Sequence, residues 1–409
     1  MKIGHKTKKF LFIGLTIFTT TVFLGCQKSK KKNIHPKTPV ISLSQKTLRA
    51  LKKETSKGVF HYSSTTPILS LKNRSKTPIK VKSLDIEFLE AKEIVHTKTI
   101  RPNELKENIY RNGQKISDDA NEVDRLNPFW NKMKDENYKV TNERSLELKQ
   151  GFVFHMGPFH INTDSEKNID RMRIKITYHW NGKTLKNPRE VKLNFSQPKN
   201  KYKFPLKGIW YVRDSWDNPS THSIKTDRET EYAQKYTIIG YNGTIFRRNL
   251  DYAQRGNADT YAYKQRVFAP ADGQIVALQD SIPNNSIVGK TTSPLGTKAI
   301  KILRSRGRLA HKFGNFIIIK HENDEYSLLA NLKPFSLQVN LGDEVKSGQH
   351  IAEVGNTRGS KEPHLHFQIQ DSLDPSRGQN IVPRFSNLRD DGNQKLKAPP
   401  SFGQVVHSD

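Results

Sequence analysis

One short segment near the carboxyl end carries both a fold signal and a chemical signal. Pro363-His364-Leu365-His366-Phe367 is followed by Gln368-Ile369-Gln370, so polar and apolar residues alternate along it. This alternation predicts a β-strand, in which residues two apart point to the same face. His364 and His366 would then lie side by side, close enough for one to bind a metal while the other works beside it. A pair of hydrogen-bonded strand histidines explains the motif about equally well when it is taken alone.

The composition limits the classes of protein to which this chain can belong. A length of 409 residues suggests two or three domains, and a mean hydropathy of −0.74 still allows each half to bury a core. The formal net charge of +29 favours contact with anionic partners such as nucleic acid, phospholipid head groups or anionic wall polymers. The lysines are spread along the whole chain without a basic-aromatic motif, so a nucleic-acid partner is not expected.

The amino terminus has the layout of a secretory signal. A lysine-rich start is followed by an apolar stretch from Phe10 to Leu24, too short to span a bilayer comfortably, and then by Gly25 and Cys26. Cys26 is the only cysteine, so an internal disulfide is excluded. The segment resembles a bacterial lipoprotein signal with a relaxed lipobox, because Phe23 stands where Leu is more usual. The resemblance implies acylation of Cys26 and a lipid anchor in the bacterial cell envelope. The alternative is an ordinary cleaved signal with a chance cysteine.

Short alternating segments dominate the middle of the chain. After a lysine-rich tether at residues 27–38, residues 39–200 contain alternating runs such as 79–88 and 172–178, separated by polar turns. Short strands with regular turns predict an antiparallel β-sandwich of immunoglobulin-like type. The polar stretch 102–139 is expected to be a long insertion with some helix. This part shows no catalytic constellation and is expected to serve as a spacer or binding module.

Five further segments in the carboxy-terminal half occur in a fixed order. They are a strand-turn-strand at 267–277, a buried strand at 314–321, a partner strand at 326–332, a Gly-Asp turn within 339–349 and a strand with a loop at 351–357. With the His-x-His strand, they closely resemble the lysostaphin/LytM-type zinc metalloendopeptidases, which cut peptidoglycan peptides. The resemblance covers roughly Trp210 to Phe385 and implies a mostly β, lysostaphin-like domain at 201–390, with a polar tail at 391–409. Biotinyl and lipoyl carrier domains share some motifs but need a lysine where Glu353 is followed by Val354.

The resemblance implies a zinc site built from three side chains. The second His of the family's His-x-His strand binds zinc and maps onto His366, while the first is catalytic and maps onto His364. The zinc-binding Asp maps onto Asp251, for which a turn residue at a strand end is the alternative. Many members place the remaining ligand four residues before the Asp, where this chain has Arg247, a permanent cation that cannot bind zinc. The match is then His222 in an earlier loop, with a solvated loop histidine as an equal alternative.

Asn331 occupies the position at which family members usually carry a second catalytic His. An amide can hydrogen-bond to an oxyanion but cannot take up a proton near neutral pH. Loss of one such group typically costs roughly 10²–10⁴-fold in rate. The resemblance therefore implies that His364 manages the proton, with Asn331 as a hydrogen-bond donor.

Three functions follow as expectations. The first is an envelope-anchored endopeptidase that holds one Zn²⁺ per chain and hydrolyses peptide bonds in peptidoglycan, with anionic wall polymers as further partners. The second is a catalytically degenerate module that binds the cell wall or activates a partner hydrolase, as Arg247 and Asn331 suggest. The third is a surface adhesive lipoprotein in which the sandwich is the functional part.

Overall fold

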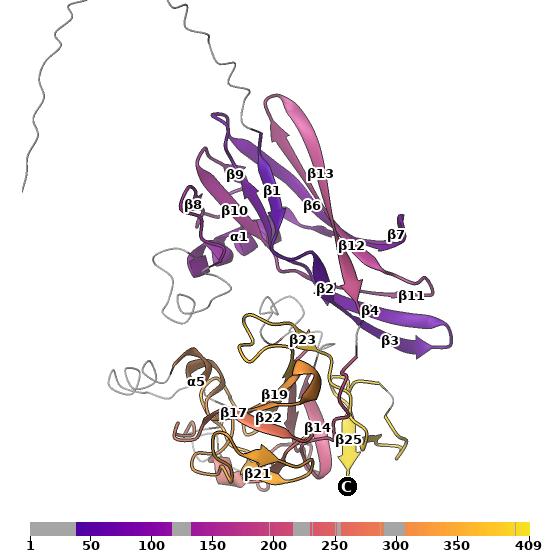
Figure 1. Cartoon of the computed structure of the whole chain (residues 1–409), viewed down its shortest axis with the longest axis vertical. Coiled ribbons are helices and arrows are strands. Elements are labelled where there is room, and N and C mark those ends of the chain that lie inside the picture. The colour runs from indigo at the N-terminus through magenta and orange to yellow at the C-terminus, as the bar shows by residue number, and fades with distance from the viewer. Residues whose placement is uncertain are drawn as a thin grey trace, which may run out of the picture. The chain divides into compact units, whose positions relative to one another are not determined.

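The fold is built almost entirely from β-strands. The computed structural model describes residues 38–116, 132–195, 197–215, 230, 232–249, 251, 255–286, 288–289, 307–396 and 398–409. Strands far outnumber helices in this part of the chain, so the prediction of a mostly β fold is confirmed (Figure 1). The predicted lipidation site Cys26 and the tether lie outside the described residues. Within the described ranges, no helix combines the length and the apolar character needed to cross a membrane.

Residues 40–194 form three sheets. A four-stranded sheet has the order β1-β5-β10-β8, a six-stranded sheet has the order β2-β13-β12-β6-β7 with β9 beside β6, and a three-stranded sheet has the order β11-β4-β3. The elements are β1 Val40–Leu43, β2 Thr47–Arg49, β3 Leu51–Ser56, β4 Val59–Thr65, β5 Leu69–Lys72, β6 Ile79–Glu90, β7 Glu93–Ile100, α1 Pro102–Ile116, β8 Lys139–Val140, β9 Glu147–Leu148, β10 Phe152–Met156, β11 His160–Ser165, β12 Arg171–Trp180 and β13 Lys183–Asn194.

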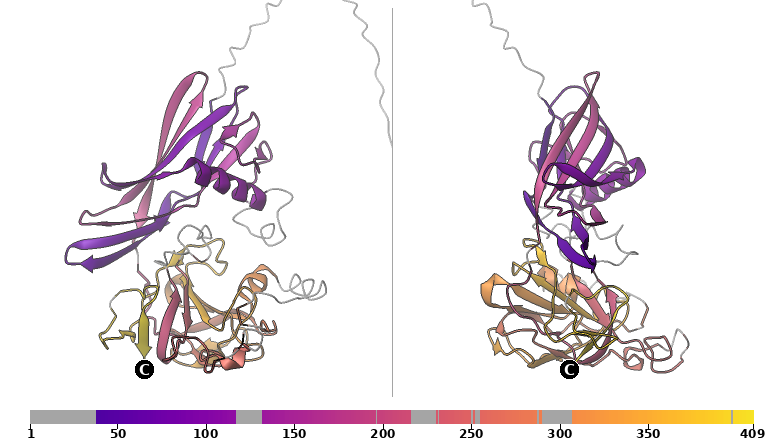
Figure 2. Two further views of the ribbon diagram at one scale, coloured as in Figure 1. Left: turned by 180° about the vertical axis from the view of Figure 1, so that it is seen from behind. Right: turned by 90° about the vertical axis from the view of Figure 1, so that its right-hand side faces the viewer.

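The first two sheets share one hydrophobic core, so this part is a two-layer β structure (Figure 2). The core follows directly from the alternation of the strands. Along β12 every second side chain is buried, from Met172 to Tyr178, and the same side of β6 contributes Leu84, Ile86 and Phe88. Helix α1 lies in the stretch expected to be a polar insertion. It contacts β10, and Leu105, Ile109 and Ile116 bury its apolar face.

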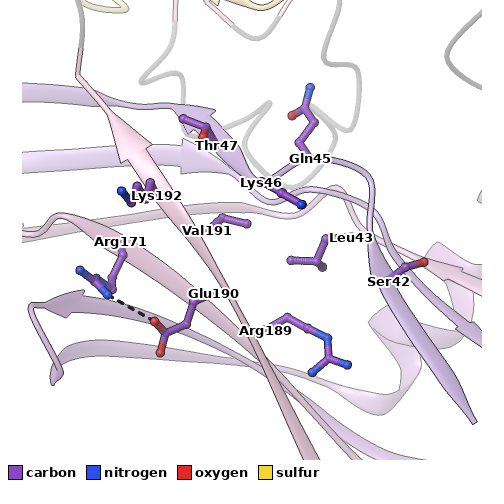
Figure 3. A pocket seen from close by; sticks show the side chains of 10 residues that line it. All are labelled: Ser42, Leu43, Gln45, Lys46, Thr47, Arg171, Arg189, Glu190, Val191 and Lys192. Carbon is purple, nitrogen blue, oxygen red and sulfur yellow. Dashed lines mark ion pairs between the residues drawn. The ribbon is translucent and has the colours of Figure 1, made fainter.

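A cavity of about 760 Å³ opens beside strands β1 and β13 (Figure 3). Cationic side chains outnumber the single carboxylate around it. Arg171 pairs with that carboxylate, Glu190, at 3.5 Å. The lining residues are Ser42, Leu43, Gln45, Lys46, Thr47, Arg171, Arg189, Glu190, Val191 and Lys192.

The carboxy-terminal part is organised around one antiparallel sheet of ten strands. Its order is β20-β17-β18-β19-β22-β15-β14-β25-β24, with β23 beside β22. A separate two-stranded sheet pairs β16 with β21. The elements are β14 Gly208–Asp214, β15 Gln234–Thr237, η3 Asn257–Asp259, β16 Arg266–Phe268, β17 Gly273–Gln279, α5 Gly307–Phe313, β18 Phe316–Lys320, η4 Glu322–Asp324, β19 Tyr326–Ala330, β20 Glu344–Val345, β21 His350–Glu353, β22 Leu365–Gln370, β23 Asn380–Ile381, β24 Arg389–Asp390 and β25 Val405–Ser408.

Two predictions for this part can be compared with the structure. The expected pairing of the strands near 314–321 and 326–332 is present as β18 and β19, which run antiparallel. Residues 391–409 differ from the expected polar tail, because β25 adds to the sheet beside β14. Val406 explains the difference, since its side chain is fully buried in the main core, and burial of a valine favours docking of the strand.

The His-x-His segment lies at the middle of the sheet. Strand β22 is flanked by β19 on one side and β15 on the other. Leu365, Phe367 and Ile369 point into the main core, which leaves His366, Gln368 and Gln370 on the opposite face. That face is also buried along the whole strand, and Phe313 of α5 packs against it at His366. The alternation therefore separates an apolar face from a buried polar one.

Candidate functional site

A small cavity of about 180 Å³ lies over the polar face of β22. Both histidines of the motif line it, as the strand period predicts. Asn331 lines it as well, and so do two lysines and one aspartate. The full lining is Asp214, Thr230, Ala233, Lys235, Lys312, Phe313, Asn331, Gly359, His364 and His366.

His364 directly precedes β22 and presents one ring nitrogen without a partner. Its Nδ1 lies 2.8 Å from the carbonyl oxygen of Glu362 and 3.0 Å from the Oγ of Ser360. A carbonyl can only accept, so Nδ1–H donates to Glu362 and the neutral ring carries its lone pair on Nε2. Nε2 is buried and has no hydrogen-bond partner among the described residues. Burial, with a smaller effect from Lys235, lowers the pKa of His364 to about 3, so the ring is neutral at pH 7.

His366 is held in the opposite tautomer by a chain of buried amides. Its Nε2 lies 2.9 Å from Oε1 of Gln368, whose Nε2 donates to Oε1 of Gln370 at 2.6 Å. Gln370 in turn donates to the carbonyl oxygens of Ser372 and Leu373. The last carbonyls in this series of hydrogen bonds can only accept, so each glutamine must donate away from the imidazole and accept on the side nearer to it. His366 therefore carries its proton on Nε2 and donates it to Gln368. Nδ1 then carries the lone pair.

Two lysines supply positive charge at the cavity. Burial is the largest cause that lowers the pKa of His366 to about 4, and Lys235 and Lys312 lower it further. Lys235 lies on β15 directly opposite His366 on β22, so their side chains share a face. Its ammonium nitrogen lies 3.2 Å from a carboxylate oxygen of Asp214, which is directly opposite Lys235 on β14. The cavity therefore contains an ion pair beside its two neutral imidazoles.

Asn331 follows β19 and presents an acceptor to the cavity. Its side-chain NH₂ donates to the carbonyl oxygens of Phe313 at 3.4 Å and Thr357 at 2.9 Å. Both amide hydrogens are thus engaged, and Oδ1 is the atom left for a ligand. The expected role of Asn331 as a donor to an oxyanion differs from this arrangement, in which the carbonyl oxygens of Phe313, at the end of α5, and of Thr357, in a neighbouring loop, accept both hydrogens.

Asp251, the other predicted site residue that the structure describes, is not brought to this cavity. Asp251 is exposed and is not among the lining residues. His222 lies outside the described residues. Arg247 donates from its Nε to the carbonyl oxygen of Thr260 at 3.1 Å and does not line the cavity.

The described donor atoms do not make a three-ligand zinc site. Structural and catalytic zinc sites use at least three protein ligands drawn from Cys, His, Asp and Glu. Within the ranges that the structure describes, no group of three such residues is close enough to hold a metal ion. At the cavity itself His366 has Lys235 beside it, and Asp214 is engaged by that lysine. A fixed ammonium repels a divalent cation, so the described residues do not suit zinc.

Sequence reasoning missed the Lys235–Asp214 pair and the Gln368–Gln370 chain. Gln234-Lys235-Tyr236-Thr237 shows no clear polar-apolar alternation, and the strand across from Lys235 cannot be read from local sequence. Gln368 and Gln370 continue the two-residue period of His364 and His366. This period is the sequence signal that would place both glutamines on the same face as the histidines.

Comparison with known proteins places the carboxy-terminal half in a family. The model described as Peptidase family M23 matches residues 254–381. Lipoprotein NlpD of Yersinia enterocolitica is 38% identical over 84 residues, which cover 20% of this chain and 84% of that protein. Murein hydrolase activator NlpD of Escherichia coli is 41% identical over 64 residues, which cover 16% of each protein. The outer membrane antigenic lipoprotein B of Haemophilus influenzae is 32% identical over 139 residues, which cover 30% of this chain and 33% of that protein.

The His-x-His strand in the middle of an antiparallel sheet, with both imidazoles on one cavity, lies within the residues that match the family model, so this is a LytM-type domain. The chain belongs to peptidase family M23, and the matching domain lies in its carboxy-terminal half. The chain spans only about a third of the Haemophilus relative, so the likeness concerns this domain and not the whole protein.

Proposed function

We propose that this chain is a bacterial cell-envelope protein whose M23 domain binds peptidoglycan peptides and activates a partner hydrolase without cutting the peptides itself. The observation that carries the proposal is the Lys235–Asp214 ion pair beside His366. It puts a lysine side chain beside the histidine that the family resemblance assigns to zinc. The name of the E. coli relative, a murein hydrolase activator, supports the same function.

The cavity offers groups that can bind a peptide. The Nε2 lone pair of His364 and the Oδ1 of Asn331 can accept hydrogen bonds from peptide N–H groups. The ammonium groups of Lys235 and Lys312 can donate to peptide carbonyls or carboxylates. A peptide carries both kinds of group at short spacing, so it complements this lining better than a purely anionic or purely apolar ligand would.

Wall binding and bond cleavage can be measured in one experiment. The chain without residues 1–26 is incubated with insoluble peptidoglycan, and the pellet and the soluble fraction are analysed. We expect the protein in the pellet and no more soluble muropeptide than His364→Ala produces. Muropeptide release by the parent that is abolished in His364→Ala would show that the domain is itself a hydrolase.

That second outcome corresponds to a second candidate function, a zinc endopeptidase of the cell wall. One observation favours it. His364 and His366 both line the cavity, and each is held in a single tautomer with a defined lone pair. Under this candidate His222 and Asp251 would complete the ligand set. Asp251 is exposed, and His222 lies outside the described residues.

A lipid anchor at Cys26 is the proposed means of localisation. The lipoprotein-like signal motivates it, and the relatives from Yersinia and Haemophilus are named lipoproteins. We expect Cys26→Ser to move the full chain from the membrane fraction to the soluble fraction of lysed cells, because the acyl chains are lost. The uncleaved parent serves as a size marker on a gel, which shows whether the signal segment has been removed from the variant. Retention of the cleaved Cys26→Ser variant in the membrane fraction would contradict the proposed lipid anchor.

Anionic wall polymers are proposed as a further partner of the two-layer β structure. The cavity beside β1 and β13 has four cationic side chains, Lys46, Arg171, Arg189 and Lys192, against one carboxylate (Figure 3). Their charge favours a polyanion, and the attraction would weaken with salt. In the sedimentation experiment, walls stripped of anionic polymer should then retain less protein than untreated walls, and equal retention would exclude this partner.

A further inference from the structure

Three neighbouring strands place three charged or basic groups in one row. Asp214 on β14 is directly opposite Lys235 on β15, and Lys235 is directly opposite His366 on β22. Residues directly opposite across antiparallel strands point to the same face, with Cβ atoms roughly 4.5–5.5 Å apart. All three residues line the same cavity. The row is therefore set by the register of the three strands together with the irregularity of β14 between Val212 and Asp214, which lets Asp214 pair with Lys235.

The rest of the cavity is rich in acceptors. His364 contributes an unpartnered and buried Nε2, and Asn331 contributes Oδ1 because both of its amide hydrogens are engaged. His366 donates the proton on its Nε2 to Oε1 of Gln368. A buried group of acceptors is stabilised by a cation or by N–H donors. Lys235 is the cationic residue of the row, and its ammonium nitrogen lies 3.2 Å from the carboxylate of Asp214.

We propose that Lys235 is a built-in cation of this M23 cavity, and that its ammonium group keeps a divalent metal away from His366 and Asp214. The proposal rests on the proposed function, since it explains why the domain would bind wall peptides without cutting them. It goes beyond that function by assigning the loss of metal binding to one side chain. Removal of the charge would leave His366 and Asp214, which line the same cavity from the strands on either side of β15, as two potential metal ligands.

A competing explanation is that Lys235 is an ordinary surface lysine with an ion pair. Its side chain is 41% exposed, which alone is typical of such a residue. The two explanations differ in what a neutral substitution does to metal binding. An ordinary ion pair on the surface would leave zinc affinity unchanged, whereas a built-in cation would suppress it.

Zinc titration of neutral variants tests the proposal. Lys235→Met removes the charge while keeping most of the volume of the side chain, and Lys235→Gln is a second neutral variant in case the first fails to fold. We expect zinc, titrated calorimetrically into the chain without residues 1–26, to bind either variant at least about tenfold more tightly than the parent. His366→Ala or Asp214→Asn in the Lys235→Met background should abolish the gain.

The controls keep the two proposals separable. Lys346→Met removes a more exposed ion-paired lysine, 3.0 Å from Asp272 and away from the cavity, and should bind zinc like the parent. Lys235→Arg keeps the charge and should also behave like the parent. Unchanged zinc affinity in both neutral Lys235 variants, or tight stoichiometric zinc binding by the parent, would overturn the inference. Sedimentation of the parent with cell walls is measured in parallel. If the parent does not bind walls but the zinc titrations give the expected result, only the proposed function is rejected and the inference about Lys235 stands.

Discussion

Gly355→Ala is expected to destabilise the M23 domain by about 3 kcal/mol, which lowers its melting temperature by about 10 °C. A Cβ at this position would lie 2.4 Å from the backbone nitrogen of Lys333 and 2.5 Å from the carbonyl carbon of Leu332. Both are backbone atoms, so no side-chain rotation relieves the overlap. Gly355 also donates its N–H to the carbonyl oxygen of Asn331 at 3.0 Å, and the overlap would push apart the two segments that this bond joins.

Gly359→Ala is the matched control for this prediction. Gly359 belongs to the same loop and lines the same cavity, but a Cβ there would meet no atom within 4 Å. Its replacement should change stability by less than about 0.5 kcal/mol. Thermal unfolding of the chain without residues 1–26, followed by calorimetry, compares the two variants with the parent. Equal melting temperatures for Gly355→Ala and Gly359→Ala would contradict the close approach of the Gly355 loop to residues 332–333.

His155→Gln is expected to reduce the acid sensitivity of the two-layer β structure. The Nδ1 of His155 pairs with the Oγ of Ser70 at 2.9 Å, while its Nε2 is buried without a partner among the described residues. Burial is the main cause that lowers the pKa of His155 to about 4, and Lys72 lowers it further. The unfolded chain has an ordinary pKa of about 6.5, so it takes up a proton before the folded chain does as the pH falls. Stability from this group is complete above pH 6.5 and is lost towards pH 4, for a total of about 3 kcal/mol.

Hydrogen exchange measures this effect locally. The amides of Leu71 and Phe154 lie in the adjacent strands β5 and β10, and their opening free energy reports on the stability of this part of the chain. Between pH 7 and pH 4.5 the parent should lose more opening free energy than His155→Gln. His179→Gln replaces an exposed histidine on β12 and should follow the parent. A parent and a His155→Gln variant with the same pH dependence would show that protonation of His155 is not coupled to unfolding.

Local periodicity predicted the parts of the fold that depend on neighbouring residues. Alternation along 364–370 placed His364 and His366 on one face, and both side chains line one cavity. The pairing of β18 with β19 was predictable because a short turn joins two apolar runs. The polar composition of residues 391–409 predicts a tail and does not indicate that Val406 completes the core or that β25 extends the sheet.

The site was harder to predict than the strands because its partners come from distant parts of the chain. The family resemblance identified His364, His366 and Asn331, and all three line the cavity. It did not identify Lys235 or Asp214, whose polar side chains look like ordinary surface residues in sequence. The hydrogen bonds of Asn331 could not be predicted either, since the loop at Thr357 and the end of α5 at Phe313 accept both of its amide hydrogens.

The sequence by itself determined that the chain is rich in strands, that it carries a His-x-His strand of the M23 type and that two imidazoles share one face. These properties follow from residue order and the two-residue period of a strand. Only the tertiary structure decided what stands beside those imidazoles. Lys235 is placed opposite His366, and Asp214 opposite Lys235, by the register of three strands that are distant in sequence. Register is set by packing of the core and by pairing along the whole sheet, so no local pattern could reveal that a lysine faces His366.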